Sequence, residues 1–176
     1  SQDHFKFDDQ TVLDMVLHGH TVMRQIMQER NELYSKADFT DEDGIKVAEL
    51  EDKFATIGGY TAENDAATLL SGLGIKENLH GKLMGELSNK QKVRVMLAQA
   101  LFGEPDNLLL DEPTNNLDPA SREEILAALR DYEGAVILVT HDPGAVTALN
   151  PERVLLLPDA DEDLWDDSYL DLVTLT

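Results

Sequence analysis

The sequence predicts an α/β protein with a helical first half and part of a parallel sheet in the second half. Apolar residues from Thr11 to about Ile75 recur at three- and four-residue steps, as on the buried face of a helix. From Leu87 onward, continuous apolar runs alternate with helical segments of about a dozen residues, which is typical of parallel strands covered on both faces. With 176 residues, 42% of them hydrophobic, the chain is long enough for a globular core.

The helical half reads as a small antiparallel unit. Helical periodicity is interrupted by a polar stretch at residues 35–44, resumes at 45–57, and ends at the Gly58-Gly59 pair. Thr61 is predicted to be the N-cap of a third helix, because its hydroxyl can accept a hydrogen bond from a free N–H of the first turn.

The second half reads as helix, strand, helix, strand and strand. Ser88 and Gln91 fit a capping box at the start of the first of these helices. Asp118 and Pro119 fit the start of the next one. An acidic stretch at 159–167 is expected to be an exposed loop. The five segments are, in order, 87–103, 107–111, 118–132, 134–142 and 152–158.

Composition excludes several classes of protein. The net charge of −21 argues against a general nucleic-acid-binding surface, because like charges repel phosphate, so any phosphate contact is expected to be local. The absence of Cys excludes disulfides and thiolate metal sites. No apolar run reaches the roughly 18 residues that cross a bilayer, and the first residues lack the pattern of a signal peptide. We therefore expect a cytoplasmic protein with no membrane segment.

Charged side chains stand where two predicted strands end. Asp111 and Glu112 follow the leucines of the first strand, and His141 follows the next strand. The carboxyl ends of parallel strands line one crevice, where ligands bind. Two adjacent carboxylates suit a divalent cation and a water molecule, and a neighbouring His can donate to a phosphate oxygen. Each residue alone has a structural alternative, but the series predicts a site for a cation and a phosphate.

The same stretches resemble a known family. "LLLDEPTNNLD" followed by "ILVTHD" resembles the Walker B, D-loop and H-loop series of ATP-binding cassette ATPases, and "LSNKQKVRVMLAQALF" resembles their signature helix. "DEPTNNLD" is similar to the "DEPTNHLD" of the ABC-F branch, with Asn116 where His is common. The resemblance implies a cassette nucleotide-binding domain that binds ATP and Mg²⁺ and pairs with a second cassette. ABC-F proteins have no membrane domain and act on the ribosome in translation.

Both ends of the chain extend the resemblance. The front, "QDHFKFDDQTVLDMVLHGH", looks like the Q-loop and the residues after it, and about 20–57 lies where ABC-F proteins carry their arm insertion. The ending "LWDDSYLDLVTL" is similar to a late aromatic segment of the family. The implied parts are a Q-loop segment at 1–10, a helical subdomain at 11–86, and the signature helix with the α/β core at 87–176.

The resemblance also implies a role for each matching residue. Asp111 would hold Mg²⁺, Glu112 would act as general base, and His141 would contact the γ-phosphate. Gln2 would reach the metal or the attacking water, and Asp118 would lie at the interface between cassettes. The signature residues would face the ATP held by the opposite cassette, at a helix N-terminus that favours anions; they are Ser88, Asn89, Lys90 and Gln91.

Two features depart from the family pattern. The signature is usually Leu-Ser-Gly-Gly-Gln, and here Asn89 and Lys90 replace both glycines, so the backbone has less freedom to approach a phosphate. The phosphate-binding loop G-x-x-x-x-G-K-[ST] is not found, because the single Gly-Lys pair, Gly81-Lys82, lacks that context. The isolated chain is therefore expected not to hydrolyse ATP.

Several interpretations stay open. The chain is either part of a longer ABC-F ATPase or a non-catalytic module that binds the ribosome or another protein. The stretch after Asp118 looks more like a second cassette, so a chimera of two cassettes is an alternative. Ribosome contact requires local basic residues, yet acids between Asp38 and Asp52 outnumber the bases in and beside the predicted arm, which argues against direct RNA contact there. These bases are Arg24, Arg30, Lys36, Lys46 and Lys53.

Overall fold

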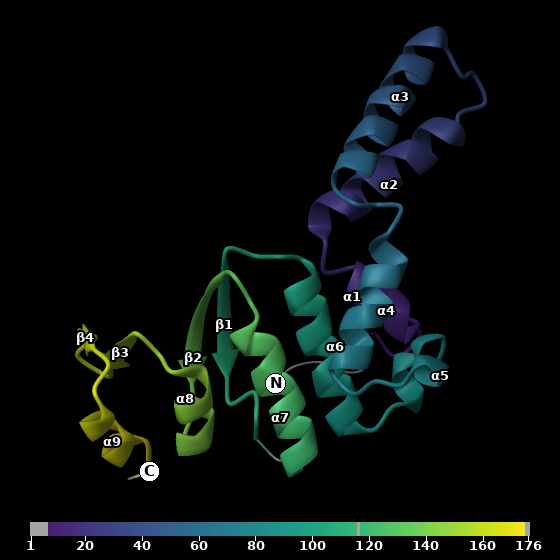
Figure 1. Cartoon of the computed structure of the whole chain (residues 1–176). Helices are drawn as coiled ribbons and strands as arrows, with labels where there is room; N and C mark the ends of the chain where they lie inside the picture. The colour runs from purple at the N-terminus through teal and green to yellow at the C-terminus, as the bar shows by residue number, and fades with distance from the viewer. Residues whose placement is uncertain (1–6, 116, 175–176) are drawn as a thin grey trace. The chain divides into compact units, whose positions relative to one another are not determined.

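The computed structural model describes residues 7–115 and 117–174. The chain forms two compact units, Ser1–Glu104 and Pro105–Thr176. Figure 1 shows helices in the first unit and a mixture of helices and strands in the second. The signature helix belongs to the helical unit, so the units divide after Glu104, whereas the sequence placed the start of the α/β part at 87. The predicted α/β class is confirmed.

The first unit contains more helices than the three expected from periodicity. The predicted first helix is broken after Leu17. Just beyond the break, the chain at Gly19 passes against the carbonyl of Gln99, and a Cβ on Gly19 would lie 1.9 Å from that oxygen. The elements are α1 (Val12–Leu17), α2 (Thr21–Tyr34), α3 (Asp41–Thr56), α4 (Ala62–Gly72), α5 (Glu77–His80), the 3-10 turn η2 (Met84–Glu86) and α6 (Asn89–Phe102).

Helices α2 and α3 form a hairpin where the arm insertion was predicted (Figure 1). Arg30 on α2 bonds Glu51 on α3 at 3.0 Å and lies 4.9 Å from the centre of the Phe54 ring. Tyr60, beyond α3, donates to the other oxygen of Glu51 at 2.6 Å. The buried residues of this part are Met23, Ile26, Leu33, Val47, Leu50, Phe54 and Ala62.

The N-terminus of α3 is held by an acid with a low pKa. Asp43 accepts hydrogen bonds from Lys36 and from the backbone and hydroxyl of Thr40, which lower the pKa of its carboxyl from 3.8 to about 2. Between about pH 2 and pH 4, the Asp43 carboxyl is therefore protonated in the unfolded chain and ionised in the folded chain. This ionised carboxylate stabilises the fold above about pH 4, and the stabilisation is lost as the pH falls to about 2.

Replacing Asp43 by Asn is expected to remove this acid-sensitive part of the stability. The variant should be less stable than the wild type at pH 7, and its stability should change less between pH 4 and pH 2. Urea unfolding across this range is the measurement. Asp38→Asn, at an exposed neighbour, should keep the wild-type dependence. An equal acid loss in Asp43→Asn and the wild type would contradict the role of this carboxyl.

The capping box predicted for the signature helix is confirmed. The Ser88 side chain accepts from the Gln91 backbone at 3.4 Å, and the Gln91 side chain accepts from the Ser88 backbone at 2.9 Å. Thr61 does occupy the N-cap position of α4, but its side chain makes no capping hydrogen bond there. Its hydroxyl bonds Asp65 at 2.7 Å instead, so the predicted contact is wrong although the helix start is right.

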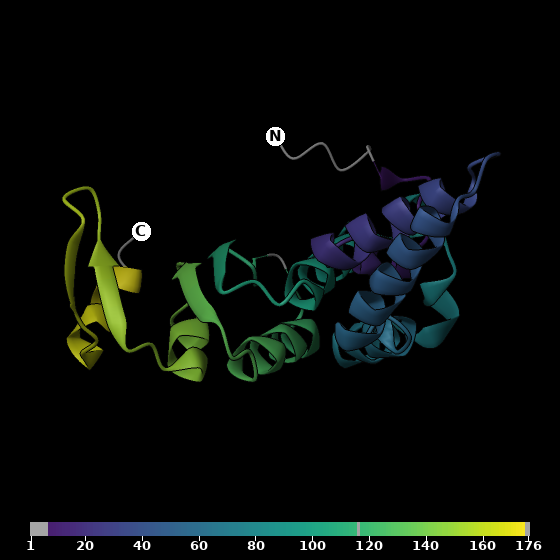
Figure 2. The same cartoon turned by 90° about the horizontal axis from the view of Figure 1, so that it is seen from above.

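The second unit is built on two parallel strands, paired in register from Asn107↔Ala135 to Asp111↔Val139. The helices α7 and α8 lie on one side of them (Figure 2). The buried residues include Leu108, Ile125, Leu126, Leu129, Ala145 and Val146. The elements are β1 (Asn107–Asp111), α7 (Pro119–Arg130), β2 (Ala135–Val139), α8 (Pro143–Leu149), β3 (Arg153–Leu156), β4 (Asp161–Leu164), the 3-10 turn η3 (Asp167–Tyr169) and α9 (Leu170–Thr174).

Within the second unit, the helices α7 and α8 lie on one face of the parallel strands, whereas Leu109 (69% exposed) and Ile137 (55% exposed) lie on the other face, which was also expected to be covered. Two predictions about the strands are wrong. The third apolar strand was expected to extend the parallel sheet. It pairs instead, as β3, with β4 in an antiparallel sheet. β4 lies within the acidic stretch expected to be a loop, and Arg153 of β3 forms an ion pair with Glu162 of β4.

Within residues 7–115 and 117–174, no helix has the length and apolar character needed to span a membrane.

Candidate functional site

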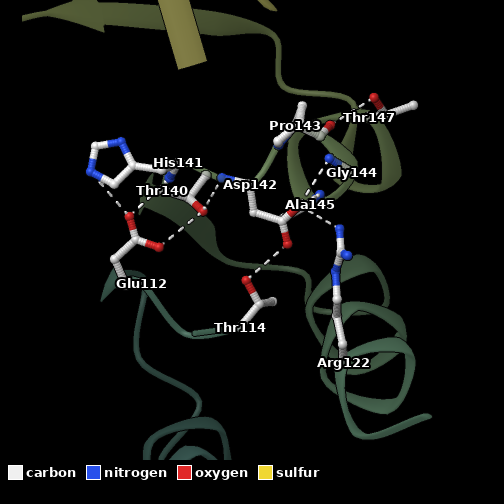
Figure 3. A network of polar contacts seen from close by, with 10 residues as sticks. All are labelled: Glu112, Thr114, Arg122, Thr140, His141, Asp142, Pro143, Gly144, Ala145 and Thr147. Atoms are coloured by element: carbon white, nitrogen blue, oxygen red, sulfur yellow. Dashed lines mark hydrogen bonds and ion pairs between the residues drawn. The ribbon is translucent and has the colours of Figure 1, made fainter. Parts of the chain in front are cut away.

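The predicted strand-end residues meet at one edge of the parallel sheet. β1 ends at Asp111 and β2 at Val139, and the register pairs these two residues. Glu112 therefore leaves the sheet beside Thr140 and His141, although 29 positions separate Glu112 from His141 in the chain. Figure 3 shows the Glu112 carboxylate pointing toward both residues. Two of the three residues predicted to act together are thus in contact.

The backbone at Glu112 has an uncommon conformation. Its φ is 47°, in the left-handed region that residues with a side chain seldom adopt. Its N–H continues the pairing of the strands by donating to the carbonyl of Val139 at 2.8 Å. Strained residues of this kind cluster at functional sites, where the surrounding structure holds them in place. The strand pairing and the turn after it hold Glu112 here, since its carbonyl accepts from Asn115 at 3.1 Å.

Both oxygens of the Glu112 carboxylate face donors. Oε1 accepts from the backbone N–H of His141 at 2.9 Å and lies 3.5 Å from the Nε2 atom of that ring. Oε2 lies 3.4 Å from the hydroxyl of Thr140. These contacts fix the direction of the carboxylate at the end of the sheet, as a group that orients a water molecule requires.

Asp111 is exposed at the same edge. Among the residues that the structure describes, no three His, Asp or Glu side chains are grouped so as to hold a metal ion. An exposed carboxylate nevertheless suits Mg²⁺, which keeps several waters and takes one or two protein carboxylates together with phosphate oxygens. Gln2, the other predicted metal ligand, lies outside the described residues.

Asp118 serves as the cap of α7 in this structure. Its carboxylate accepts from the Ser121 backbone at 3.0 Å and from the Ser121 hydroxyl at 2.6 Å. Ser121 is buried, so this contact anchors the turn to the helix. The structural role of Asp118 is therefore visible, and its role at an interface stays a prediction.

The signature residues lie in the first unit, at the exposed N-terminal turn of α6. Ser88, Asn89 and Lys90 are exposed there. The Gly81-Lys82 pair forms no phosphate-binding loop: Lys82 lies 3.5 Å from Glu86, and its carbonyl accepts from Val12 at 2.9 Å. The described residues thus offer carboxylates and a His for a nucleotide site, without a loop of the G-x-x-x-x-G-K-[ST] type.

Sequence reasoning missed several residues around His141. Asp142 accepts from the Thr114 hydroxyl at 3.1 Å and from Arg122, and it caps α8 through the N–H groups of Gly144 and Ala145 (Figure 3). The pair Asp142-Pro143 repeats the pattern of Asp118-Pro119, which was recognised as a helix start. That signal could have identified the cap, but not the contacts made by Thr114 and Arg122.

Comparison with known proteins gives the same family as the motifs. The family described as ABC transporter matches residues 2–115, and an AAA domain family (putative AbiEii toxin, type IV toxin–antitoxin system) matches 89–147. The ABC transporter ATP-binding protein YkpA of Bacillus subtilis is 51% identical over 141 residues, which are 80% of this chain and 26% of that protein. The human ATP-binding cassette sub-family F member 3 is 30% identical over 152 residues, 85% of this chain and 21% of that protein.

A solved structure supports the fold. It is the dimeric post-hydrolysis state of the ATP-binding cassette MJ0796 bound to ADP and Pi, with a TM-score of 0.54 and 22% sequence identity. The match covers 92% of this chain and 60% of that cassette. This chain thus spans about a quarter of the two curated relatives. Because the family match covers more than half of the sequence and includes both the signature helix and the Asp111–Glu112 strand end, the chain belongs to the ABC transporter family of ATP-binding cassettes.

Proposed function

We propose that this chain supplies the signature helix and the hydrolytic residues of an ABC-F-type cassette that binds and hydrolyses ATP with Mg²⁺. One observation carries the proposal: the Glu112 carboxylate is held 2.9 Å from the backbone nitrogen of His141, at the sheet edge where Asp111 is exposed. A sheet edge with this chemistry is where α/β proteins bind ligands. The names of the relatives, which include a sub-family F member, support the choice of branch.

Each residue would have a separate task. Asp111 would hold Mg²⁺, which supplies positive charge against the phosphates when it is bound. Glu112 would orient a water molecule and accept its proton, with its carboxylate directed by Thr140 and His141. The His141 ring, which is 63% exposed, would donate a hydrogen bond to a phosphate oxygen.

A second cassette would complete the site. The exposed turn formed by Ser88, Asn89, Lys90 and Gln91 would face the ATP bound by the partner, since a helix N-terminus favours anions. Asp118 would lie near the contact between the cassettes. The dimeric state of the solved cassette that resembles this chain supports a paired arrangement.

The ribosome is the proposed place of action, and the cytoplasm the proposed location. Support comes from the ABC-F resemblance and from the hairpin of α2 and α3 where that branch carries its arm. Two bases of this hairpin already face acids: Arg30 bonds Glu51, and Lys36 bonds Asp43. These two bases are therefore less available to bind RNA phosphate.

The 176-residue chain alone is expected to bind Mg-ATP weakly or not at all and to show no ATP hydrolysis. The reason is that a backbone cradle and a lysine normally hold the β- and γ-phosphates, and the sequence contains no such motif. Isothermal titration of the chain with Mg-ATP is the measurement, and micromolar affinity would contradict the prediction. Joining the chain to a segment that carries a phosphate-binding loop should produce ATP binding. This joined protein is called the completed cassette.

A non-catalytic binding module is the second candidate. Tyr34, the last residue of α2, stacks on Phe39 in the connection to α3, with 6.3 Å between the ring centroids. Tyr34 is 59% exposed and Phe39 is 49% exposed. Exposed aromatic pairs are typical of protein contact surfaces. This candidate predicts that the completed cassette also fails to bind Mg-ATP, whereas a change of both residues to Ser abolishes binding to ribosomes.

A further inference from the structure

Asp142 accepts more hydrogen bonds than a helix cap requires. Its Oδ1 atom accepts from the N–H groups of Gly144 at 3.0 Å and Ala145 at 3.2 Å, which is the N-cap of α8. The same oxygen accepts from the guanidinium of Arg122, and Oδ2 accepts from the hydroxyl of Thr114 at 3.1 Å. A cap alone would use the first two donors, so the other two indicate a further role.

These donors come from three different parts of the second unit (Figure 3). Thr114 is buried in the turn that follows Glu112, and Arg122 lies in the first turn of α7, next to the cap made by Asp118. Gly144 and Ala145 begin α8. One carboxylate therefore joins the turn after β1, the helix after that turn, and the helix after β2.

Asp142 is also connected to the Glu112–His141 pair. Its backbone N–H donates to the Thr140 hydroxyl at 3.1 Å, and that hydroxyl lies 3.4 Å from Oε2 of Glu112. His141 stands between Thr140 and Asp142 in the chain, and its own N–H donates to Oε1 of Glu112. The backbone at Asp142 is thus linked to both donors that direct Glu112.

We propose that Asp142 is a positioning residue, held by Arg122 and Thr114, which fixes the strand-end turn that presents His141 and directs the Glu112 carboxylate. The inference rests on the proposed function, because it assigns Asp142 a task in that site. Arg122 has the same task, because its ion pair connects the start of α7 to Asp142 in the turn after β2. The position of the Asp118 cap and the geometry of the Glu112–His141 pair therefore depend on one another.

The test separates capping from positioning. Asn is as good an N-cap as Asp, so Asp142→Asn keeps the two α8 contacts while removing the charge that holds Arg122. Arg122→Met removes the same ion pair from the other side, and Arg122→Lys restores a cation. Arg130→Met is the matched control, because Arg130 lies on the same helix, 3.8 Å from Glu123 and apart from this network.

Amide hydrogen exchange, measured by NMR on the 176-residue chain, is the first readout. The exchange rate of the His141 amide is divided by that of Leu110 in β1, so that a general loss of stability cancels. We expect this ratio to rise about tenfold in Asp142→Asn and Arg122→Met, because a charge-assisted hydrogen bond is lost. The ratio should be near the wild-type value in Arg122→Lys and Arg130→Met. The Ala145 amide should stay protected from exchange in Asp142→Asn, because Asn keeps the cap of α8.

The second readout is ATP hydrolysis by the completed cassette. Asp142→Asn and Arg122→Met should lower kcat about tenfold with little change in KM, because they disturb the direction of Glu112 and leave nucleotide binding intact. An unchanged exchange ratio at His141 in both variants would overturn the proposal. Hydrogen exchange needs no nucleotide, so that result would leave the proposed ATPase activity untouched. Conversely, a raised exchange ratio in the variants, together with a completed cassette that does not hydrolyse ATP, would overturn the proposed ATPase activity alone.

Discussion

Replacing Glu112 by Gln is expected to lower the rate of ATP hydrolysis by the completed cassette at least about 100-fold, because a general base contributes about that much. Gln keeps the size of the side chain and still accepts the N–H of His141, which lies 2.9 Å from Oε1 in the wild type. It cannot accept a proton from water. ATP binding should therefore be retained, and hydrolysis should be measured as phosphate release at saturating ATP.

Glu123→Gln is the control for this substitution. Glu123 is an exposed residue of α7 and takes no part in the network around Glu112, so its variant should hydrolyse ATP at the wild-type rate. Phosphate release by Glu112→Gln at the rate of the control would show that Glu112 has no role in activating water.

Replacing His141 by Ala is expected to lower kcat about 100-fold, the usual cost of removing one donor to the charge that develops in the transition state. The ring is 63% exposed, so its loss should change the melting temperature little. The donor to Glu112 at 2.9 Å is the backbone N–H of His141, which the variant keeps. The loss of rate should therefore report the ring alone.

Steady-state kinetics of the completed cassette would check this prediction. His141→Gln retains a side-chain N–H donor and should recover part of the lost rate. Equal rates for His141→Ala and the wild type would remove His141 from the chemistry and leave it as a residue of the strand-end turn.

The helix starts could be predicted from the sequence because capping is a local interaction. Ser88 pairs with Gln91 and Asp118 accepts from Ser121, each three positions away, and both helix starts were found where expected. The close approach of Gly19 to the carbonyl of Gln99 could not be predicted, since Gln99 lies on another helix, 80 positions away. A local pattern does not contain contacts between residues so far apart in the chain.

Exposure of the strands was beyond prediction for a related reason. The leucines of β1 form the same apolar run whether one face or both faces are covered, yet Leu108 is buried and Leu109 is exposed. The strand that pairs with β3 could not be predicted either. It is β4, which consists of Asp161, Glu162, Asp163 and Leu164, and three of these are poor strand formers. Backbone pairing with β3 overrides that preference.

The candidate site was predicted in outline and not in its supporting contacts. Glu112 and His141 were expected to meet because parallel strands end at one edge, and they do. The positive φ of Glu112 and the contacts of Asp142 with Thr114 and Arg122 leave no such signal in the sequence. Those contacts come from the tertiary structure, so the motif pointed to the proposed reacting groups but not to the residues in contact with them.

The nucleotide that remains bound to the Glu112→Gln variant of the completed cassette tests the central claim most directly. The variant is loaded with Mg-ATP, separated from free nucleotide by gel filtration, and the bound nucleotide is identified by chromatography. If Glu112 activates the water, the bound nucleotide is ATP in the variant and mainly ADP in the wild type. Bound ADP in both proteins would contradict the assignment of hydrolysis to the strand ends of β1 and β2.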